Sequence, residues 1–216
     1  MKLLILDYGS GNLKSVYNSI KYVLNDSNLG YEVLVSNKIL NIKKSDYIIL
    51  PGVGSFQNCM LNLSVRPELI DHLKDHALSK KKPFLGICVG MQLIANYGLE
   101  NGKTLGLGWI KGKVKHLNFN GICKRNNLKI PHMGWNSLNI NCKSKILSNI
   151  NFNDQFYFVH SYFFDIDSDK NVIAYSKYGI NFPSIIYKEN IIGLQFHPEK
   201  SGNSGQKVLT NWLTKY

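Results

Sequence analysis

The sequence predicts an α/β fold, with a central, mostly parallel sheet flanked by helices and antiparallel strands added in the C-terminal half. Short apolar runs alternate with segments of helical periodicity up to about residue 105, as in strands joined by crossover helices. Beyond Leu105, short strands and turns replace the helical periodicity. The length of 216 residues suits one α/β domain with a full core. We therefore expect a single domain over residues 1–216.

The N-terminal half supplies the parallel strands and their helices. Almost wholly apolar segments, typical of strands buried on both faces, predict strands at residues 3–7, 31–35, 47–50 and 84–87. Apolar residues at helical spacing predict helices at residues 13–24, 67–79 and 91–95.

The C-terminal half predicts antiparallel additions and a closing helix. Strands are predicted at residues 113–117, 128–130, 156–164 and 172–175. Residues 185–187 and 191–196, separated by a turn at 188–190, predict a hairpin. Val208, Leu209, Trp212 and Leu213 predict a final helix.

The formal charge of +12 raises the question of a nucleic-acid ligand. The lysines are scattered, and their densest clusters, at residues 80–82 and 111–115, are short and lie in no nucleic-acid-binding motif. We therefore favour a solvated, lysine-rich surface, which could also steer an anionic substrate or an acidic partner. Nucleic-acid binding is the last of the functions considered.

The compartment is predicted from what the chain lacks. No apolar run approaches the ~20 residues that span a bilayer, and residues 1–7 fit a first strand better than a signal peptide. The four cysteines form no C-x-x-C pair and no metal-like spacing with histidine. We therefore expect a cytoplasmic protein with free thiols, no metal, no cofactor and no membrane contact.

A cysteine between two glycines lies at the centre of the pattern. Cys88 lies in the segment Gly86-Ile87-Cys88-Val89-Gly90, directly after a predicted buried strand and before a predicted helix. This is the place of the nucleophile in a nucleophile elbow. Such a turn needs glycine beside the nucleophile, and the nearby helix N-terminus favours a thiolate. A buried core cysteine is the alternative that this motif alone leaves open.

A second motif, about a hundred residues downstream, supplies a base. His197 and Glu199 are two residues apart in an extended segment, so their side chains leave the same face, and Pro198 stiffens the link. A carboxylate there can fix the imidazole tautomer while the other ring nitrogen faces a nucleophile. A surface ion pair is the simpler interpretation of this segment alone. Together with Cys88 it predicts a Cys-His-Glu acyl-transfer triad.

Acyl transfer also needs N–H donors for the developing oxyanion. The backbone N–H of Val89 is one candidate, and the loop Pro51-Gly52-Val53-Gly54 is the natural source of another. The two glycines would let that loop turn an amide inward, a change that substrate binding could bring about. A plain β-turn is the alternative for this loop.

Three of these motifs together resemble the class I (triad-type) glutamine amidotransferases. The motifs are Pro51-Gly52-Val53-Gly54, Gly86-Ile87-Cys88-Val89-Gly90-Met91-Gln92 and Gln195-Phe196-His197-Pro198-Glu199. Three further segments are similar to one branch of that family, the glutaminase subunits of imidazole glycerol phosphate synthases. These are Asp7-Tyr8-Gly9-Ser10-Gly11-Asn12-Leu13, Pro131-His132-Met133-Gly134-Trp135-Asn136 and Tyr157-Phe158-Val159-His160-Ser161-Tyr162. With Glu199-Lys200-Ser201 they span nearly the whole chain in the family's order.

The resemblance implies the family's fold and a role for each matching residue. Cys88 would attack the side-chain amide of L-glutamine, with protons managed by His197, which Glu199 orients. Gly52, Val53 and Val89 match the oxyanion region, although the family commonly has leucine in place of Val89. The substrate pocket matches Gln92, Glu100, Ser161 and Tyr162.

The resemblance also implies a heterodimer. Ammonia would pass to a HisF-type (β/α)8-barrel cyclase, which makes imidazole glycerol phosphate and an aminoimidazole carboxamide ribotide in histidine biosynthesis. The face toward that partner matches Asn12, Met133, Trp135, Asn136, Tyr157 and Lys200. Simpler interpretations are a helix cap for Asn12, core or rim aromatics for Trp135 and Tyr157, and a solvated charge for Lys200. We interpret His160 as a core histidine and assign no role to His72, His76, His116 or His132.

Three other functions remain as alternatives. A paralogue of these subunits would feed ammonia to a surface-polysaccharide sugar amidotransferase, with the same chemistry at Cys88. A stand-alone cysteine hydrolase would use the same elbow without a partner, but it would have no need of a docking face at Trp135 and Lys200. A non-catalytic binding module is disfavoured because Cys88, His197 and Glu199 are all present.

Overall fold

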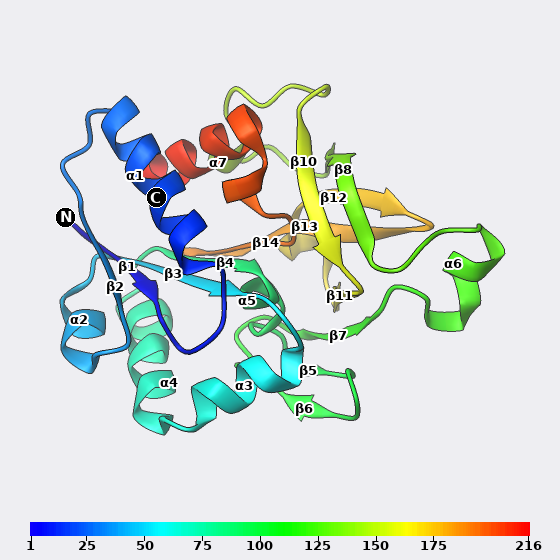
Figure 1. Ribbon diagram of the computed structural model, residues 1–216, viewed down its shortest axis with the longest axis horizontal. Coiled ribbons are helices and arrows are strands. Elements are labelled where there is room, and N and C mark those ends of the chain that lie inside the picture. The colour runs from blue at the N-terminus through cyan, green and yellow to red at the C-terminus, as the bar shows by residue number, and fades with distance from the viewer.

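An eight-stranded sheet runs through the molecule in the order β2-β1-β3-β4-β14-β13-β12-β9 (Figure 1). The structure is a computed structural model that describes residues 1–119 and 121–216 in full. The first five strands are parallel: β2 (Glu32–Ser36), β1 (Lys2–Leu6), β3 (Tyr47–Gly52), β4 (Phe84–Cys88) and β14 (Ile191–Leu194). The last three continue antiparallel: β13 (Ile180–Lys188), β12 (Val172–Tyr178) and β9 (Asn139–Ile140). This arrangement confirms the predicted α/β class.

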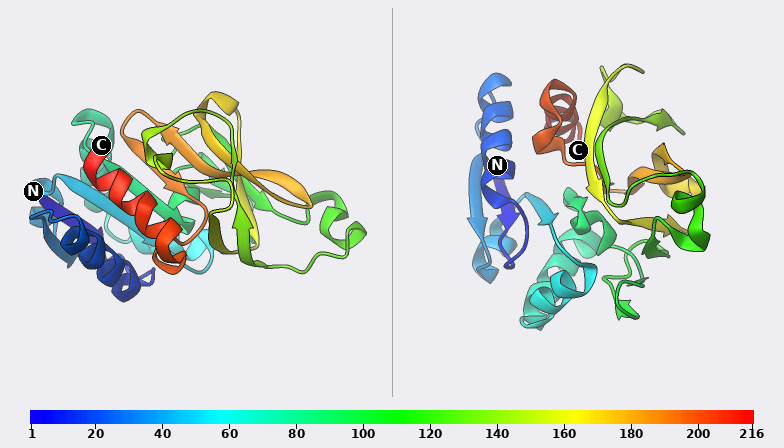
Figure 2. Two further views of the ribbon diagram at one scale, coloured as in Figure 1. Left: turned by 90° about the horizontal axis from the view of Figure 1, so that it is seen from above. Right: turned by 45° about the vertical axis from the view of Figure 1, so that its right-hand side comes forward.

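Helices cover both faces of the parallel part. On one face α1 (Leu13–Asp26) and α7 (Gly202–Lys215) lie side by side, and on the other lie α2 (Ile39–Lys44), α3 (Phe56–Ser64) and α4 (Pro67–Lys74) (Figures 1 and 2). Covered in this way, β3 and β4 are buried along their whole length, which explains their continuous apolar sequences. The hairpin of β13 and β14, the helix α1 and the closing helix α7 were all predicted.

Two smaller sheets extend the C-terminal half. One pairs β8 (His132–Ser137) with β10 (Gln155–His160), and the other has the order β11-β7-β5-β6. The bounds of the second are β11 (Tyr162–Ile166), β7 (Gly112–His116), β5 (Tyr97–Gly98) and β6 (Thr104–Leu105). Within the described residues no helix is both long and apolar enough to cross a membrane.

Two strand predictions in this half are wrong. The single strand predicted at 156–164 breaks at Ser161, because His160 pairs with His132 in one sheet and Tyr162 pairs with His116 in another. Two short apolar strands in direct succession form one apolar run, so periodicity cannot divide them. The strand predicted at 128–130 is an irregular segment after α6 (Ile122–Arg125), and its apolar side chains pack against the core without a partner strand.

Helix boundaries differ in places from those predicted. The helix after the elbow is α5 (Val89–Gln92), which starts earlier and ends sooner than the predicted 91–95. The predicted helix at 67–79 is confirmed as α4 continued by a π-helical turn over Asp75–Ser79. Among the flanking helices of the parallel sheet, α2 and α3 had no counterpart in the prediction.

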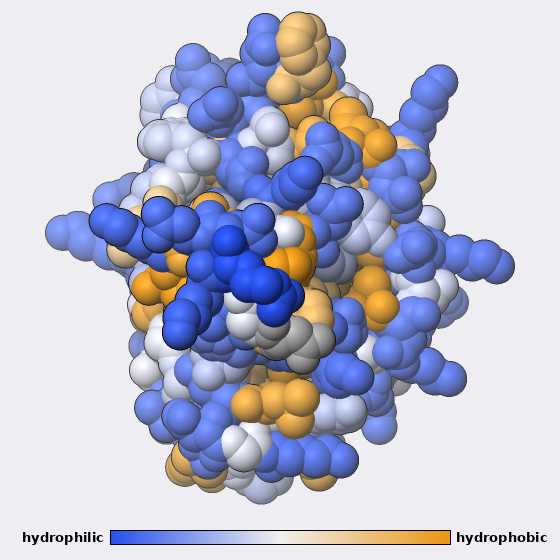
Figure 3. Space-filling view, turned by 90° about the vertical axis from the view of Figure 1, so that its right-hand side faces the viewer, coloured by the Kyte–Doolittle hydropathy of each residue, from blue (hydrophilic) through white to orange (hydrophobic). Residues whose placement is uncertain are grey.

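The surface agrees with a solvated, lysine-rich chain. The face shown in Figure 3 is mostly hydrophilic, and its hydrophobic side chains gather in small, separate areas. Four of the lysine ion pairs, with Glu32, Asp75, Glu189 and Asp165, lie at the surface or near it.

Candidate active site

The backbone at Cys88 has the geometry of a nucleophile elbow. Cys88 ends β4 with φ +54° and ψ −111°, a left-handed conformation that non-glycine residues rarely adopt, and α5 begins at the next residue. A Cβ on Gly86 would lie 2.7 Å from the carbonyl oxygen of Gly90, and one on Gly90 would lie 1.9 Å from that of Leu50. The two flanking glycines are therefore required by contact, as the motif predicts.

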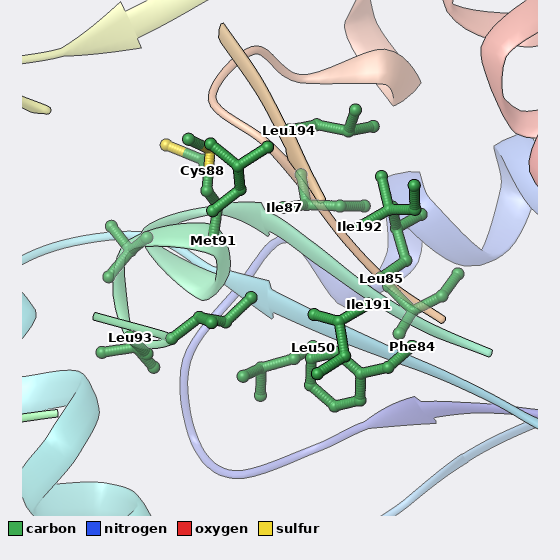
Figure 4. Packing of buried hydrophobic residues seen from close by; sticks show 14 of the residues in the cluster. Leu50, Phe84, Leu85, Ile87, Cys88, Met91, Leu93, Ile191, Ile192 and Leu194 are labelled. Atoms are coloured by element: carbon green, nitrogen blue, oxygen red, sulfur yellow. The ribbon is translucent and has the colours of Figure 1, made fainter. Parts of the chain in front are cut away.

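The sulfur lies at the rim of the apolar core. Figure 4 shows Cys88 at the carboxyl end of β4, beyond the packed side chains of Leu85, Ile87 and Ile192. Cys88 is 4% exposed. It is therefore shielded from bulk water on the sheet side and faces a pocket on the other.

The pairing of β4 with β14 brings the two motifs together. In the parallel register Leu194 lies beside Ile87, so the carboxyl ends of both strands meet at one edge, where Cys88 and the segment after β14 follow. There the Nδ1 atom of His197 is 2.8 Å from Oε1 of Glu199, and both side chains are almost fully buried. A carboxylate only accepts, so Nδ1 carries the proton and Nε2 is left for the sulfur side.

Electrostatics favour a charged imidazole in this setting. Burial lowers the pKa of His197, but the Cys88 thiolate, through its charge and a hydrogen bond, and the Glu199 carboxylate together raise it to about 10. Two hydrogen bonds fix the main chain at His197. Its N–H donates to the Tyr157 carbonyl at 2.9 Å, and its carbonyl accepts from the Ser201 hydroxyl at 2.6 Å. The arrangement suits a thiolate–imidazolium pair.

A pocket of about 300 Å³ opens over this pair. Eight of the residues predicted for the site line it: Val53, Cys88, Val89, Gln92, Glu100, Ser161, Tyr162 and His197. The two other predicted residues lie directly behind the lining. Glu199 contacts the His197 ring, and Gly52 packs against α5, so closely that a Cβ added to Gly52 would lie 2.6 Å from the Gly90 nitrogen. The pocket is also lined by Gly54, Pro131, Val159 and His160, to which the sequence analysis gave no substrate contact.

Two side chains bring polar groups into the pocket wall. Gln92 uses its amide nitrogen twice, donating to the Tyr162 carbonyl at 2.8 Å and to Oε1 of Gln195 at 3.0 Å, which leaves its own oxygen for a ligand. Glu100 accepts from the Phe56 N–H at 2.7 Å through Oε2. A carboxylate held in this way suits a substrate ammonium group.

The loop after β3 is held by Ser10 in this structure. The Ser10 hydroxyl donates a hydrogen bond to the Val53 carbonyl at 2.7 Å. The Val53 N–H in turn points at the Ser10 hydroxyl oxygen, at a distance of 3.4 Å. Tyr8 donates to the Pro51 carbonyl at 2.7 Å, which fixes the start of the loop. The Val53 amide is thus engaged with Ser10, and the side chain of Val53 is 43% exposed.

Sequence reasoning gave no role to Ser10 and Gln195, which contact the candidate machinery. Ser10 lies 43 residues from Val53 and inside a glycine-rich turn, so no local signal marks it. Gln195 is 0% exposed and places its amide nitrogen 3.8 Å from the Cys88 sulfur. The sequence did offer one sign of a role for Gln195, because its polar side chain interrupts the otherwise apolar run 191–196.

His160 forms a pair with His132 in the wall behind the pocket. The His160 Nδ1–H donates to the Tyr162 carbonyl at 2.9 Å, so its Nε2 accepts from Nδ1–H of His132 at 3.0 Å. Burial lowers the pKa of His132 to about 4 and that of His160 to about 3. Both rings are therefore neutral at physiological pH, as suits the interpretation of His160 as a core histidine.

The residues expected at a partner face include an exposed aromatic group. Trp135 is 55% exposed, and its ring meets Tyr157, its neighbour across β8 and β10, edge-on at 5.9 Å. Lys200 lies over the Tyr157 ring at 5.9 Å, and Met133 is also exposed. The other two have internal contacts: Asn12 caps α1 by accepting from the Ser15 N–H, and Asn136 donates to the Lys177 carbonyl at 3.0 Å.

Comparison with known proteins now identifies the family. Residues 4–216 match the family model for glutamine amidotransferase class-I. The chain is 44% identical over 214 residues to the imidazole glycerol phosphate synthase subunit HisH of Pelagibacter ubique, covering 99% of both chains. It is 40% identical to the HisH subunit of Rhodospirillum rubrum, covering 99% of this chain and 98% of that one. The chain belongs to the HisH family of class I glutamine amidotransferases.

Solved structures agree with this family at the level of the fold. A crystal structure of a glutamine amidotransferase superposes with a TM-score of 0.71 at 15% identity, covering 97% of this chain and 96% of that one. At that identity the likeness speaks for the fold alone. The class I glutamine amidotransferase fold and the family resemblance of the motifs are both confirmed, and the chain is an enzyme subunit of the HisH type.

Proposed function

We propose that this chain is the glutaminase subunit of an imidazole glycerol phosphate synthase, hydrolysing L-glutamine through Cys88, His197 and Glu199. The observation that carries the proposal is the strained Cys88 elbow facing the same pocket as the Glu199-bound His197. Membership of the HisH family supports the pathway, since HisH relatives are named as subunits of that synthase.

The first half-reaction would run as follows. The Cys88 thiolate attacks the side-chain amide carbon of glutamine, forming a C–S bond and an oxyanion that N–H groups at Val89 and Val53 stabilise. The His197 imidazolium gives its proton to the amide nitrogen as the C–N bond breaks, so ammonia leaves and a glutamyl thioester remains. Glu199 keeps the ring oriented by holding Nδ1–H.

The second half-reaction restores the enzyme. Neutral His197 takes a proton from water as the oxygen attacks the thioester carbon, and the C–S bond then breaks to release glutamate and the Cys88 thiolate. Glu100 would pair with the substrate ammonium group through the oxygen that Phe56 leaves free, and the Gln92 oxygen would accept a further substrate hydrogen bond. Ser161 and Tyr162 would complete the pocket wall.

The freed ammonia would go to a HisF-type (β/α)8-barrel cyclase docked on Trp135, Tyr157 and Lys200, with contributions from Met133, Asn12 and Asn136. The exposed Trp135–Tyr157 pair supports this face, since aromatic anchors with a basic neighbour are typical of interfaces. We place the heterodimer in the cytoplasm, in keeping with four free cysteines.

The decisive experiment replaces the sulfur in the heterodimer. Cys88→Ala, assayed with the partner cyclase and its nucleotide substrate, should abolish product formation from glutamine while leaving product formation from added ammonium salts intact. Cys142→Ala is the matched control, because Cys142 is a free thiol that donates to the Val172 carbonyl, remote from the pocket. Full turnover of glutamine by Cys88→Ala would end the proposal. Loss of the ammonia-dependent reaction as well would show a folding defect instead, which the melting temperature of each variant checks.

The same assay tests the acceptor. Imidazole glycerol phosphate formed from glutamine and the phosphorylated ribulosyl aminoimidazole nucleotide supports the histidine pathway. If only a sugar-modifying partner draws ammonia from this chain, the paralogue function holds and the acceptor proposed here is wrong.

A further inference from the structure

Two groups of the protein besides His197 contact the Cys88 sulfur within hydrogen-bonding range for sulfur. The thiol faces the Val159 carbonyl at 3.9 Å, and the side-chain nitrogen of Gln195 faces the sulfur at 3.8 Å. Gln195 is 0% exposed and follows β14, two residues before His197, with its own backbone N–H bound to the Ser184 carbonyl at 2.9 Å. A buried amide aimed at the reacting atom needs an explanation beyond packing.

The orientation of that amide follows from its neighbours. The Tyr162 carbonyl can only accept, so the group that Gln92 turns to it must be the amide nitrogen, at 2.8 Å. The second hydrogen of that nitrogen then meets Gln195 at 3.0 Å, and only an oxygen can receive it. The Gln195 oxygen therefore faces Gln92, and its NH₂ group faces the sulfur.

An amide flipped the other way would be doubly unfavourable. It would set two NH₂ groups against each other between Gln92 and Gln195, and it would place a carbonyl oxygen against a sulfur that must become negative. Both contacts would be buried, where unsatisfied or repelled polar groups cost most. The chain of bonds from Tyr162 through Gln92 thus delivers an N–H donor to Cys88.

We propose that Gln195 is a positioning residue that donates a hydrogen bond to the Cys88 thiolate and holds the sulfur in its attacking orientation. The inference rests on the proposed function, in which Cys88 is the nucleophile. A donor to the charged form of a group favours that form, and here the sulfur is 4% exposed, so little water competes. The contact should be stronger to the thiolate of the pair with His197 than to a neutral thiol, because a thiolate is a much better acceptor.

Other titratable groups surround the sulfur. They are His197 after β14, Cys59 on α3, Tyr8 after β1, and Glu100 and His160 in the pocket wall. All of them are unchanged in the variants proposed here, so a difference between variants reports on the amide.

The test is the pH profile of alkylation at Cys88 in the full chain. The rate of iodoacetamide addition, assigned to Cys88 by mass spectrometry of the peptide, is measured from pH 5 to 10 for wild type, Gln195→Met and Gln195→Glu. Loss of a hydrogen bond to a charged group should move the rise in rate toward higher pH by about one unit, or lower the rate tenfold near neutrality. Gln195→Glu keeps the shape and puts a carboxylate beside the sulfur, so its profile should move at least as far.

Asn211→Leu is the matched control. Asn211 is another buried amide, and it donates to the Ile146 and Ser148 carbonyls at 3.0 and 2.7 Å, away from the pocket. This variant should lose thermal stability and keep the wild-type alkylation profile. A purely structural role for Gln195 predicts the same pattern for Gln195→Met.

The outcomes separate this inference from the proposed function. A wild-type profile in Gln195→Met, or an equal shift in Asn211→Leu, overturns the role of Gln195, while the loss of glutamine turnover in Cys88→Ala still stands. If Gln195→Met does not fold, Gln195→Leu, which also removes the donor without adding a charge, decides: an upward shift supports the donor, and an unchanged profile refutes it.

Discussion

Acidification from pH 6.5 to 5 should destabilise the fold through three histidines that are buried in the neutral form. Burial lowers the pKa of His76 and His132 to about 4 and that of His160 to about 3. In the unfolded chain each titrates near 6.5. Below that pH the unfolded state binds more protons than the folded state, so the stability present above pH 6.5 is lost as the pH falls.

The magnitude follows from proton linkage. Each group should lose about 1.6 kcal/mol of folding free energy between pH 6.5 and 5, and the three together about 5 kcal/mol, comparable with the whole stability of many domains. His197 acts weakly in the opposite direction in this window. Its pKa is raised to about 10, so the folded state is already protonated, while the unfolded chain takes up its proton around pH 6.5; acidification to pH 5 therefore adds only about 0.4 kcal/mol of stability from this group. Asp46 and Asp154 have lowered pKa values, so their contributions are lost mainly below the window.

Equilibrium urea unfolding at several pH values from 5 to 7 measures this dependence. His76→Gln is the informative variant, since a glutamine nitrogen can still donate to the Pro83 carbonyl that His76 contacts at 3.2 Å, while the titrating group is gone. Its slope of unfolding free energy against pH should fall by about a third. Asn211→Leu, which removes a buried amide that does not titrate, should lower the unfolding free energy and keep the wild-type slope. A flat wild-type free energy over this range, or an unchanged slope in His76→Gln, would refute the reasoning.

Three further outcomes follow from contacts described above. Gly90→Ala should give little folded protein by circular dichroism, because its Cβ would lie 1.9 Å from a backbone oxygen of β3, and a normal melting temperature would contradict this. Ser10→Ala removes the group that engages the Val53 amide, so glutaminase turnover without a partner should rise severalfold in a coupled glutamate assay; an unchanged or lower rate speaks against it. Trp135→Ala should weaken partner binding by tenfold or more in calorimetry, as expected of a hot-spot residue, and should leave the glutaminase rate without partner unchanged. An affinity equal to that of the wild type would remove Trp135 from the interface.

The elbow was predictable because its cause is local. A strand, a glycine on each side of Cys88 and a helix lie within about ten residues, and the clashes that a Cβ would make at Gly86 and Gly90 arise from that short stretch and the adjacent strand. The parallel strands were predictable for a similar reason, since burial on both faces leaves a continuous apolar run. The break at Ser161 was not, because it depends on which partner strand each half finds, and neither partner is close in sequence.

Contacts made across the fold explain what the motifs could not supply. Gln195 meets Cys88 only because β14 inserts beside β4, although the two residues are 107 positions apart in the sequence. The motif around His197 includes Gln195, but the direction of its amide is set by Gln92 and Tyr162 from two other elements. Sequence patterns therefore identify the residues near the chemistry, while the roles of those held by tertiary hydrogen bonds need coordinates.

The loop after β3 shows how such a contact can govern activity. Turning the Val53 N–H toward the pocket rotates the Gly52–Val53 peptide and breaks its weak 3.4 Å contact with the Ser10 oxygen. The 2.7 Å bond from the Ser10 hydroxyl to the Val53 carbonyl holds the next peptide and resists the turn. The turn would gain one charge-assisted bond to the oxyanion, about 1.5–3 kcal/mol against about 0.5–1.5 kcal/mol for the neutral bond lost. Gly54, with φ +93°, and Gly52 permit the rotation. That gain exists only while the oxyanion is present, so in the resting chain the Ser10 contacts hold the loop. A docked partner that adds a few kcal/mol can shift this equilibrium, and we expect slow glutaminase turnover in its absence.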